Sequence, residues 1–370
     1  MRVKLKDITK FSKGTQINGK NLIDDGAYSY LNGGINSSGK WNEFNVSENT
    51  VTISEGGNSS GYVNYMNDAF WCGAHCYYLY DGPKNSKYLY YALKSQQERL
   101  FRIRSGACMP NIKKSDLGNF IIEYEKDEVR QEEVVKVLEK CELLIEDYNK
   151  KLTLLDEAVR ARFVEMFGDP VINSCQFPVQ PMTDICDIID GDRGKNYPKS
   201  EEILDDGYCL FLNAKNVTQK GFDFENCNFI TREKDDALRN GKLSRGDVVL
   251  TTRGTVGNLA YYSKNVPYEN IRINSGMVIL RMNRSILNEI YFIELFKMKL
   301  SDIKEKIASG SAQPQLPIST MNKIILMIPP LELQNQFASF VQEIDKSRLR
   351  ELLAIKQIKL LLNDSWLLLY

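Results

Sequence analysis

The stretch "GACMPNIKKSDLGNFII", residues 106–122, returns later in the chain as "GSAQPQLPISTMNKIIL", residues 310–326. The two copies share a glycine, a proline and a branched apolar residue at the same spacing: Gly106 with Gly310, Pro110 with Pro314, Ile112 with Leu316. Similarity at a fixed long interval is the signature of a repeated architecture, which has to be found before single elements are assigned. The chain is therefore predicted to be a tandem duplication.

Each copy of this stretch leads into a long segment with helical periodicity, residues 123–169 and residues 329–370. When Gln131 is matched to Gln334, Phe167 falls on Tyr370, so both segments end at equivalent positions. The sequence thus predicts four parts in order, globular, helical, globular and helical: 1–122, 123–169, 170–328 and 329–370.

The duplication extends upstream of the helical segments. "YSYLNGGINSSGKW" (28–41) matches "YCLFLNAKNVTQKGF" (208–222) with one gap, and "VTISEGGNSSGYVNY" (51–65) matches "VVLTTRGTVGNLAYY" (248–262). The first match aligns three pairs: Leu31 with Leu212, Asn32 with Asn213, Gly39 with Gly221. Outside these stretches the globular parts diverge, so two related but different heads are expected.

The first helical segment carries a sustained apolar heptad, with steps of four and three residues: Val134, Leu138, Cys141, Ile145, Tyr148, Leu152, Leu155, Val159. In the second segment the apolar stripe is interrupted by Arg348 and Lys359 and comprises Phe337, Val341, Ile344, Leu352, Ile355, Leu362. Such periodicity is typical of coiled coils, although each helix could instead pack only on its own head. We expect antiparallel pairing of two rods of about 60 Å, at ~1.5 Å per residue.

The heads are predicted to be mixed α+β. Strands are indicated by β-branched and aromatic runs between turn residues: "NTVTIS" (49–54), "FWCGAHCYYLY" (70–80), "DVVLTT" (247–252), "SGMVILRM" (275–282). Helices are expected at corresponding places in the two halves, within residues 86–103 and 288–308.

Composition indicates a soluble protein. The chain has 370 residues, 43% of them apolar and 26% charged, without a run of 18 apolar residues that could cross a membrane. The N-terminus lacks an apolar signal core, and the eight cysteines show no regular pairing. We therefore expect a cytoplasmic protein in a reducing compartment.

The charge is unevenly distributed, although the net charge is zero. Residues 123–169 hold 14 acidic and 8 basic side chains, a net charge of −6, and residues 329–370 are balanced. The heads must therefore carry the compensating positive charge. This bias permits nucleic-acid binding but does not require it.

A nucleotide site is the first functional alternative, because "GGINSSGKW" (33–41) contains G-x-x-x-x-G-K from Gly34. A phosphate-binding P-loop needs Ser or Thr after the lysine and must open a helix. Here Trp41 follows Lys40 and the next residues read as turn and strand. We therefore interpret this stretch as a loop of the first head.

Catalytic and metal-binding patterns are also weak. The chain has one histidine, His75, no G-x-G-x-x-G and no Glu-x-Lys. Residues 72–76, "CGAHC", could offer Cys72, His75 and Cys76 to zinc, but a structural zinc site uses four ligands. A strand with small core residues accounts better for this stretch, so we expect neither a bound metal nor a cofactor.

The heads do offer polar loops at aligned positions, and these are the candidate DNA-binding residues. Asn pairs with adenine and Arg or Lys with guanine in the major groove, while glycine lets backbone N–H groups approach phosphates. For each residue alone an ordinary solvated turn is the better explanation, and it is the recurrence at aligned positions in both heads that favours DNA binding for the group. The first head contributes Asn32, Asn36, Ser37, Lys40, Gly57, Asn58 and Ser59, and the second contributes Asn213, Lys215, Asn216, Thr252, Arg253, Gly254 and Thr255.

Over nearly its whole length the chain resembles the specificity (S) subunit of type I restriction–modification systems. The resemblance is carried by two divergent heads that are each followed by a long helix, by G-x-x-x-P-x-[IL] before each helix, and by "DEAVRARFVEMFGD" (156–169). It implies two target-recognition domains, each reading half of a bipartite site in double-stranded DNA, and paired helices that fix the spacer. It also implies a subunit without catalysis that binds two modification subunits, which hold S-adenosylmethionine, and that can recruit ATP-dependent restriction subunits.

Two other functions stay open at this point. One is a coiled-coil adaptor that does not read DNA. The other is the recognition portion of a single-chain restriction enzyme, for which the sequence shows no catalytic domain.

Overall fold

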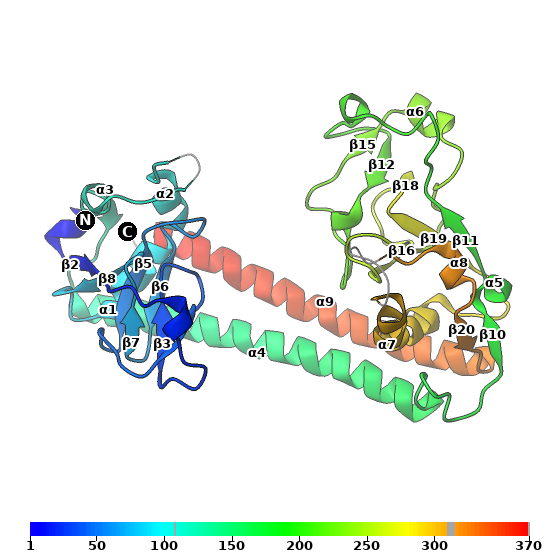
Figure 1. Ribbon diagram of the computed structural model, residues 1–370, viewed down its shortest axis with the longest axis horizontal. Helices are drawn as coiled ribbons and strands as arrows, with labels where there is room; N and C mark the ends of the chain where they lie inside the picture. Colours follow the sequence, from blue (N-terminus) through cyan, green and yellow to red (C-terminus); the bar gives the residue numbers. More distant parts are fainter. Residues whose placement is uncertain (107–108, 309–314, 369–370) are drawn as a thin grey trace. The chain divides into compact units, whose positions relative to one another are not determined.

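The computed structural model describes residues 1–106, 109–308 and 315–368. It comprises two compact units, Met1–Asn149 with Leu352–Tyr370, and Lys150–Glu351 (Figure 1). Each unit therefore contains one head and one end of each long helix. Gly310, Pro314 and Tyr370, which enter the sequence alignments, lie outside the described residues.

Head 1, residues 2–123, is built from three small sheets. Strands β1 and β9 form an antiparallel pair, a four-stranded sheet has the order β2-β8-β5-β6, and a three-stranded sheet has the order β4-β3-β7. Strand β7 runs parallel to β3, and the other pairs are antiparallel. The strands are β1 (Arg2–Lys4), β2 (Lys10–Lys13), β3 (Tyr28–Leu31), β4 (Gly39–Trp41), β5 (Thr50–Ser54), β6 (Val63–Met66), β7 (Phe70–Cys72), β8 (Cys76–Tyr80) and β9 (Ile121–Glu123).

Head 2, residues 179–327, repeats this topology. Its sheets are the antiparallel pair β10-β20, the four-stranded order β11-β19-β16-β17 and the three-stranded order β15-β12-β18, in which β18 runs parallel to β12. A short hairpin, β13-β14, is added. The strands are β10 (Val179–Pro181), β11 (Cys186–Asp190), β12 (Cys209–Leu212), β13 (Val217–Thr218), β14 (Gly221–Phe222), β15 (Phe229–Ile230), β16 (Val248–Thr251), β17 (Leu259–Tyr261), β18 (Ile271–Ile273), β19 (Met277–Met282) and β20 (Ile325–Met327).

Individual backbone hydrogen bonds repeat as well. Leu5 donates to the carbonyl of Phe120 over 2.9 Å, and Met182 donates to that of Ile324 over 3.0 Å. The predicted duplication and the mixed α+β class are therefore confirmed. The strands expected from "NTVTIS", "DVVLTT" and "SGMVILRM" are present as β5, β16 and β19, because β-branched residues pack well on a buried pleated surface.

One aligned pair is corrected by the structure. Gly39 opens β4, which pairs with β3, whereas Gly221 opens β14, which pairs with β13. The strand at the place of β4 is β15, because it pairs with β12. Head 2 thus has a hairpin inserted between β12 and β15. A one-residue gap therefore could not align this part of head 2 with the connection between β3 and β4.

The shorter helices also correspond between the heads. Asn85 caps α1 by accepting from the N–H of Tyr88 over 2.9 Å, and Asn288 accepts from the N–H groups of Ile290 and Tyr291 at the start of α7. The short helices are η1 (Leu5–Asp7), η2 (Gly19–Asn21), α1 (Ser86–Lys94), α2 (Gln97–Arg102), α3 (Lys114–Gly118), α5 (Met182–Ile185), η3 (Ser200–Glu202), η4 (Ala214–Asn216), α6 (Arg232–Ala237), α7 (Glu289–Ala308) and α8 (Ile318–Met321).

The two long helices are α4 (Glu128–Phe167) and α9 (Leu331–Leu368). In the first unit Val134 and Leu138 of α4 are buried in the core of head 1, and Leu362 of α9 packs against the same cluster. In addition, Tyr91 of α1 donates its hydroxyl to Glu142 of α4 over 2.7 Å. Head 1 is therefore packed directly on the start of α4.

In the second unit an aromatic cluster joins α4, α7 and α9. The ring centroids of Phe163 and Phe337 lie 5.4 Å apart, and Tyr291 stacks on Phe163 at 5.6 Å. Further along, Arg348 pairs with Asp156 over 2.6 Å. Residue numbers rise along α9 as they fall along α4, so the helices run antiparallel, as expected.

The apolar stripe of α9 differs from the prediction at one position. Leu352 was expected on the paired face but is 44% exposed, whereas Ile355 is 7% exposed. Arg348, expected as an interruption, lies on the less exposed face with its side chain 23% exposed. The four-and-three spacing is kept by Ile344, Arg348, Glu351 and Ile355, because the position rather than the residue type sets the face. The predicted residues Ile145, Leu152, Leu155 and Ile344 are partly buried, and Val341 is buried.

Candidate nucleic-acid interface

Three segments of head 1 meet at one end of the four-stranded sheet. They are the connection after β3 (32–38), the connection after β5 (55–62) and the turn between β7 and β8 (73–75). Ser54 and Ser59 both donate their hydroxyls to the carbonyl of Gly33, and Asn64 donates to that of Ile35 over 3.2 Å. We call these three segments the loop face of head 1.

Gly33 is a point of close contact between two of these segments. Its φ of +84° is unfavourable for other residues, and a Cβ there would overlap the carbonyl oxygen of His75. Gly33 directly precedes the G-x-x-x-x-G-K stretch, which begins at Gly34, and it is required by packing. Moreover, Lys40 lies in strand β4 rather than at the start of a helix, so the nucleotide-site alternative is wrong.

The repeated stretch that begins "GACMPNI" is hydrogen-bonded to the loop face through its backbone. Ile112 donates its N–H to the carbonyl of Glu55 over 2.9 Å, and Leu316 donates to that of Thr252 over 3.0 Å. Isolated bridges follow the same plan, Gly56 with Asn111 and Arg253 with Gln315. The motif therefore fixes the connection after the central strand in both heads.

The candidate residues of head 1 lie on or beside this loop face. Asn36, Ser37, Lys40 and Asn58 are exposed, whereas Asn32, Gly57 and Ser59 are partly buried. Asn32 uses its side-chain oxygen to accept from the N–H of His75 over 3.3 Å. Ser37 donates to the carbonyls of Tyr30 and Gly39, in the two strands that flank it. The groups most open to a ligand are thus those of Asn36, Lys40 and Asn58.

In head 2 the loop face comprises the connection after β12 (213–228), the connection after β16 (252–258) and the turn between β18 and β19 (274–276). Arg253, Gly254 and Thr255 are exposed, as is Lys215 in the turn after β12. Asn213, partly buried, accepts from the N–H of Lys215 over 2.9 Å and so caps that turn.

Two candidates of head 2 are buried instead. Asn216 is 2% exposed, and its amide donates to the carbonyls of Asp223 and Asn226. Thr252 is 5% exposed and donates its hydroxyl to the carbonyl of Gly276 over 3.0 Å. Both side chains are used to hold loops, since buried polar groups need internal partners. We therefore leave them out of the proposed contact surface.

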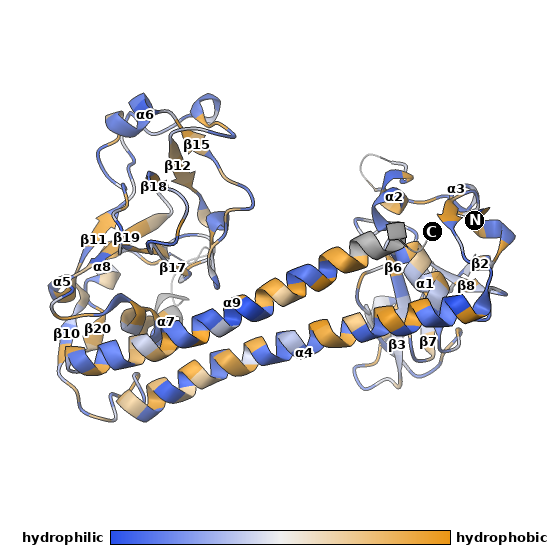
Figure 2. Cartoon of the chain, turned by 180° about the vertical axis from the view of Figure 1, so that it is seen from behind, coloured by the Kyte–Doolittle hydropathy of each residue, from blue (hydrophilic) through white to orange (hydrophobic). Residues whose placement is uncertain are grey.

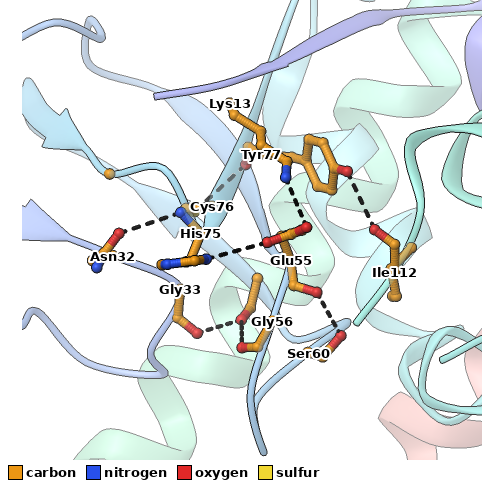
Figure 3. Close-up of polar contacts among 12 residues, drawn as sticks. Lys13, Asn32, Gly33, Glu55, Gly56, Ser60, His75, Cys76, Tyr77 and Ile112 are labelled. Atoms are coloured by element: carbon orange, nitrogen blue, oxygen red, sulfur yellow. Dashed lines mark hydrogen bonds and ion pairs between the residues drawn. The ribbon is translucent and has the colours of Figure 1, made fainter. Parts of the chain in front are cut away.

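A charged cluster on head 1 was not among the candidates. The carboxylate of Glu55 bonds Lys13 at 2.7 Å and the Nδ1 atom of His75 at 3.4 Å (Figure 3). These residues come from β2, from the connection after β5 and from the turn before β8, so no local motif brings them together. The single histidine of the chain is the one sequence signal for this cluster, and its two neighbouring cysteines favour zinc as its interpretation.

The zinc alternative finds no support in the described residues, where no three His, Cys, Asp or Glu side chains gather as metal ligands. Cys72 ends β7 and Cys76 begins β8, so "CGAHC" is two strand ends joined by a turn rather than one strand. Both cysteines are buried. A hydrogen bond with Cys76 and burial both raise the pKa of the Cys72 thiol, which keeps it neutral.

Fold and loop faces together define a class of protein: a duplicated chain whose two heads present polar loops of different sequence on one framework, each packed on paired long helices. The family described as type I restriction modification DNA specificity domain matches residues 1–155 and 177–360. The chain belongs to this family.

Known proteins are similar over most of their length. A Mycoplasma genitalium protein described as a candidate type I specificity subunit is 28% identical, with 90% of this chain and 84% of that protein covered. A Mycoplasma pneumoniae counterpart is 26% identical, with 93% and 88% covered. The crystal structure of a type I restriction–modification S subunit from M. genitalium shares the fold with a TM-score of 0.59 and 21% identity, with 100% of this chain and 96% of that chain covered.

No helix among the described residues is both long and apolar enough to cross a membrane.

Proposed function

We propose that the chain is the DNA-binding specificity subunit of a type I restriction–modification complex, in which each head reads one half of an asymmetric bipartite site. The observation that carries this proposal is the repeated attachment of the loop face. Glu55 and Thr252 are held by equivalent backbone hydrogen bonds, while the exposed residues around them differ. A common frame with different polar loops is what two different half-sites require.

The exposed groups suit both parts of DNA recognition. Arg253 presents a guanidinium that can bond both acceptors on the major-groove edge of guanine, and the amide of Asn36 or Asn58 can pair with adenine. Lys40 and Lys215 are exposed cations suited to phosphates, which position a protein without reading sequence. In this proposal Gly57 and Gly254, which have no side chain, let the backbone N–H groups approach a DNA phosphate closely.

The long helices have a second role in this proposal, to fix the spacer and to bind the modification subunits. Figure 2 shows apolar residues continuing along α4 and α9 among hydrophilic ones. Several are strongly exposed: Val137 61%, Leu143 61% and Leu154 59% on α4, Leu353 50% and Leu361 59% on α9. Exposed apolar side chains that gather into one patch mark an interaction surface. We assign them to the two modification subunits.

Catalysis and cofactors are assigned to the partners. As the resemblance implies, S-adenosylmethionine and ATP are held by modification and restriction subunits, and the chain itself has no enzymatic role. The location proposed for the complex is the cytoplasm, where its DNA substrate is found.

The test is a DNA-protection and gel-shift experiment with the chain alone and in complex with its modification subunit. The probe is a plasmid library, and the site is read from the methylome of a host expressing the complex. A protected site with two separated specific halves, seen with the complex, supports the proposal. If neither form binds DNA specifically while the modification subunit still binds the chain, the adaptor function is correct instead.

A further inference from the structure

Lys13, Glu55 and His75 form a compact charged cluster on head 1. The side chain of Glu55 is only 14% exposed, while those of Lys13 and His75 are 44% and 61% exposed. Figure 3 shows the side chains of Lys13 and His75 both directed at this carboxylate. Glu55 is therefore an internal anchor, and the side chains of Lys13 and His75 are presented to solvent.

The cluster belongs to the loop face rather than to a separate surface. His75 donates its N–H to the side chain of Asn32, and its carbonyl accepts from the N–H of Glu55 over 2.8 Å. With Nδ1 directed at Glu55, the Nε2 atom of His75 has no hydrogen-bond partner in the part of the chain that the structure describes. This nitrogen is available to an acceptor outside the protein.

Head 2 is built differently at the same place. The bond from Glu55 to the carbonyl of His75 has its counterpart in the bond from Thr252 to the carbonyl of Gly276. In head 2, Thr252 and Gly276 therefore stand in the places of Glu55 and His75, and neither of them carries a charge.

The strand register places Asp190 of head 2 at the position that Lys13 has in head 1. Asp190 pairs with Arg193 at 3.1 Å. Arg193 also donates to the carbonyl of Ser275 in the turn between β18 and β19. Head 2 thus carries at this site a cation that stays charged at all physiological pH values.

Imidazole is the class of side chain that changes charge between about pH 5 and 8, and the cluster supplies one through His75. Lys13 faces it across Glu55, and burial raises the pKa of the neighbouring Tyr77 to about 12, so that phenol stays neutral. Cys72 and Cys76 are buried behind the turn, and the pKa of Cys72 is raised. With His75 protonated the cluster has a net charge of +1, and with His75 neutral its net charge is zero.

We propose that His75, oriented by Glu55 and accompanied by Lys13, contacts the DNA of the first half-site only when it is protonated. Recognition by head 1 then weakens as the pH rises, whereas recognition by head 2 through Arg193 does not. This inference rests on the proposed function and adds a specific contact to it. The acceptor is a phosphate oxygen or the N7/O6 edge of guanine, both of which accept from an imidazolium.

The test uses the full chain in complex with its modification subunit and a duplex carrying the bipartite site read from the methylome. Dissociation constants are measured from pH 5.5 to 8 and from 50 to 200 mM salt. A hydrogen bond to a charged group contributes about 1.5–3 kcal/mol, so the wild-type complex should weaken at least about tenfold over this pH range. Part of any such change can come from the partner, so variants of this chain decide its origin.

His75→Gln should bind weakly at every pH and should lower the salt dependence at pH 5.5 by about one phosphate contact if the acceptor is a phosphate. His75→Lys should bind tightly at every pH, because its charge does not titrate in this range. Arg193→Gln should weaken binding equally at all pH values, which makes it the matched control in head 2.

Two failures are distinguishable. If the wild-type complex recognises no bipartite site, the proposed function is wrong. If it recognises the site but His75→Gln and His75→Lys keep the wild-type pH profile, the function stands and the contact through His75 is refuted. Since His75 is exposed, both variants should have the melting temperature of the wild type. A lowered melting temperature identifies a folding defect. In that case Lys13→Gln, at another exposed position, replaces the His75 variants in the test.

Discussion

The backbone N–H of Ile112 donates to the carbonyl of Glu55 over 2.9 Å, and this bond attaches the repeated stretch before α4 to the loop face of head 1. Ile112 itself is fully buried in the core of head 1. One residue therefore links the hydrophobic core to the position of the polar loops.

Ile112→Ala should destabilise the protein by about 2–5 kcal/mol, because a large buried side chain is removed and leaves a cavity. The free energy of unfolding is measured by urea denaturation. Met109→Ala is the matched control from the same segment, since Met109 is 78% exposed and its loss should change stability by less than about 0.5 kcal/mol. Equal effects of the two substitutions would contradict the assignment of Ile112 to the core.

Asp235 and Arg272 form a buried ion pair in head 2, with exposures of 0% and 5%. Lys242 also bonds Asp235, over 2.5 Å. Asp235→Ala leaves the guanidinium without its counter-ion and should cost about 3–5 kcal/mol in unfolding free energy. Asp236→Ala is the control, because Asp236 is the neighbouring aspartate and is exposed. A loss below 1 kcal/mol for Asp235→Ala would show that the pair is not needed.

The hydrogen bonds of Asp235 predict that the stability of the protein decreases in acid. Burial opposes ionisation of Asp235, but the hydrogen bonds from Lys242 and Arg272 outweigh it, so the pKa is lowered. Its contribution to stability is therefore fully present above the ordinary aspartate pKa of about 3.9 and is lost as the pH falls through the lower folded-state value. Denaturation curves at a series of pH values from 6 to 2 should show a smaller acid loss for Asp235→Asn than for the wild type. Parallel curves would refute the pairing as the cause.

Arg253→Ala should relax specificity at one half-site only, with a loss of about 1–3 kcal/mol for the preferred base. Lys40→Ala is the comparison in head 1, where a phosphate contact should weaken binding without a change of sequence preference. Methylome sequencing of hosts expressing each variant with the modification subunit reads both halves at once. Equal relaxation of both halves by Arg253→Ala would rule out independent heads.

Seven residues inserted into both α4 and α9 should lengthen the helical pair by about 10 Å, at ~1.5 Å per residue. The spacer between the half-sites should then grow by about three base pairs, at ~3.4 Å each, or binding should be lost. The methylome gives the spacer length directly. A spacer of the original length would show that the helices do not set the distance. Insertion of seven residues into the exposed turn at residues 205–207 serves as a control.

The sequence by itself determined the duplication, the type of most elements and the antiparallel long helices. These features depend on local periodicity, and the heptad from Val134 to Val159 or the β-branched run at Thr50–Ser54 can be read without knowing what packs against it. The repeated G-x-x-x-P-x-[IL] stretch was equally visible, although its task of holding Glu55 and Thr252 was not.

Tertiary structure alone decided which polar residues of the loops are available. Asn216 and Thr252 look like Asn36 and Thr255 in the sequence, but the first two are buried. Asn216 donates to carbonyls within its own connection, and Thr252 donates to the carbonyl of Gly276, 24 residues away. The cluster around Glu55 is assembled from three separated segments. Whether a loop side chain faces a ligand or holds the fold depends on partners that only folding brings near, because hydrogen bonds between distant segments leave no periodic trace in the sequence.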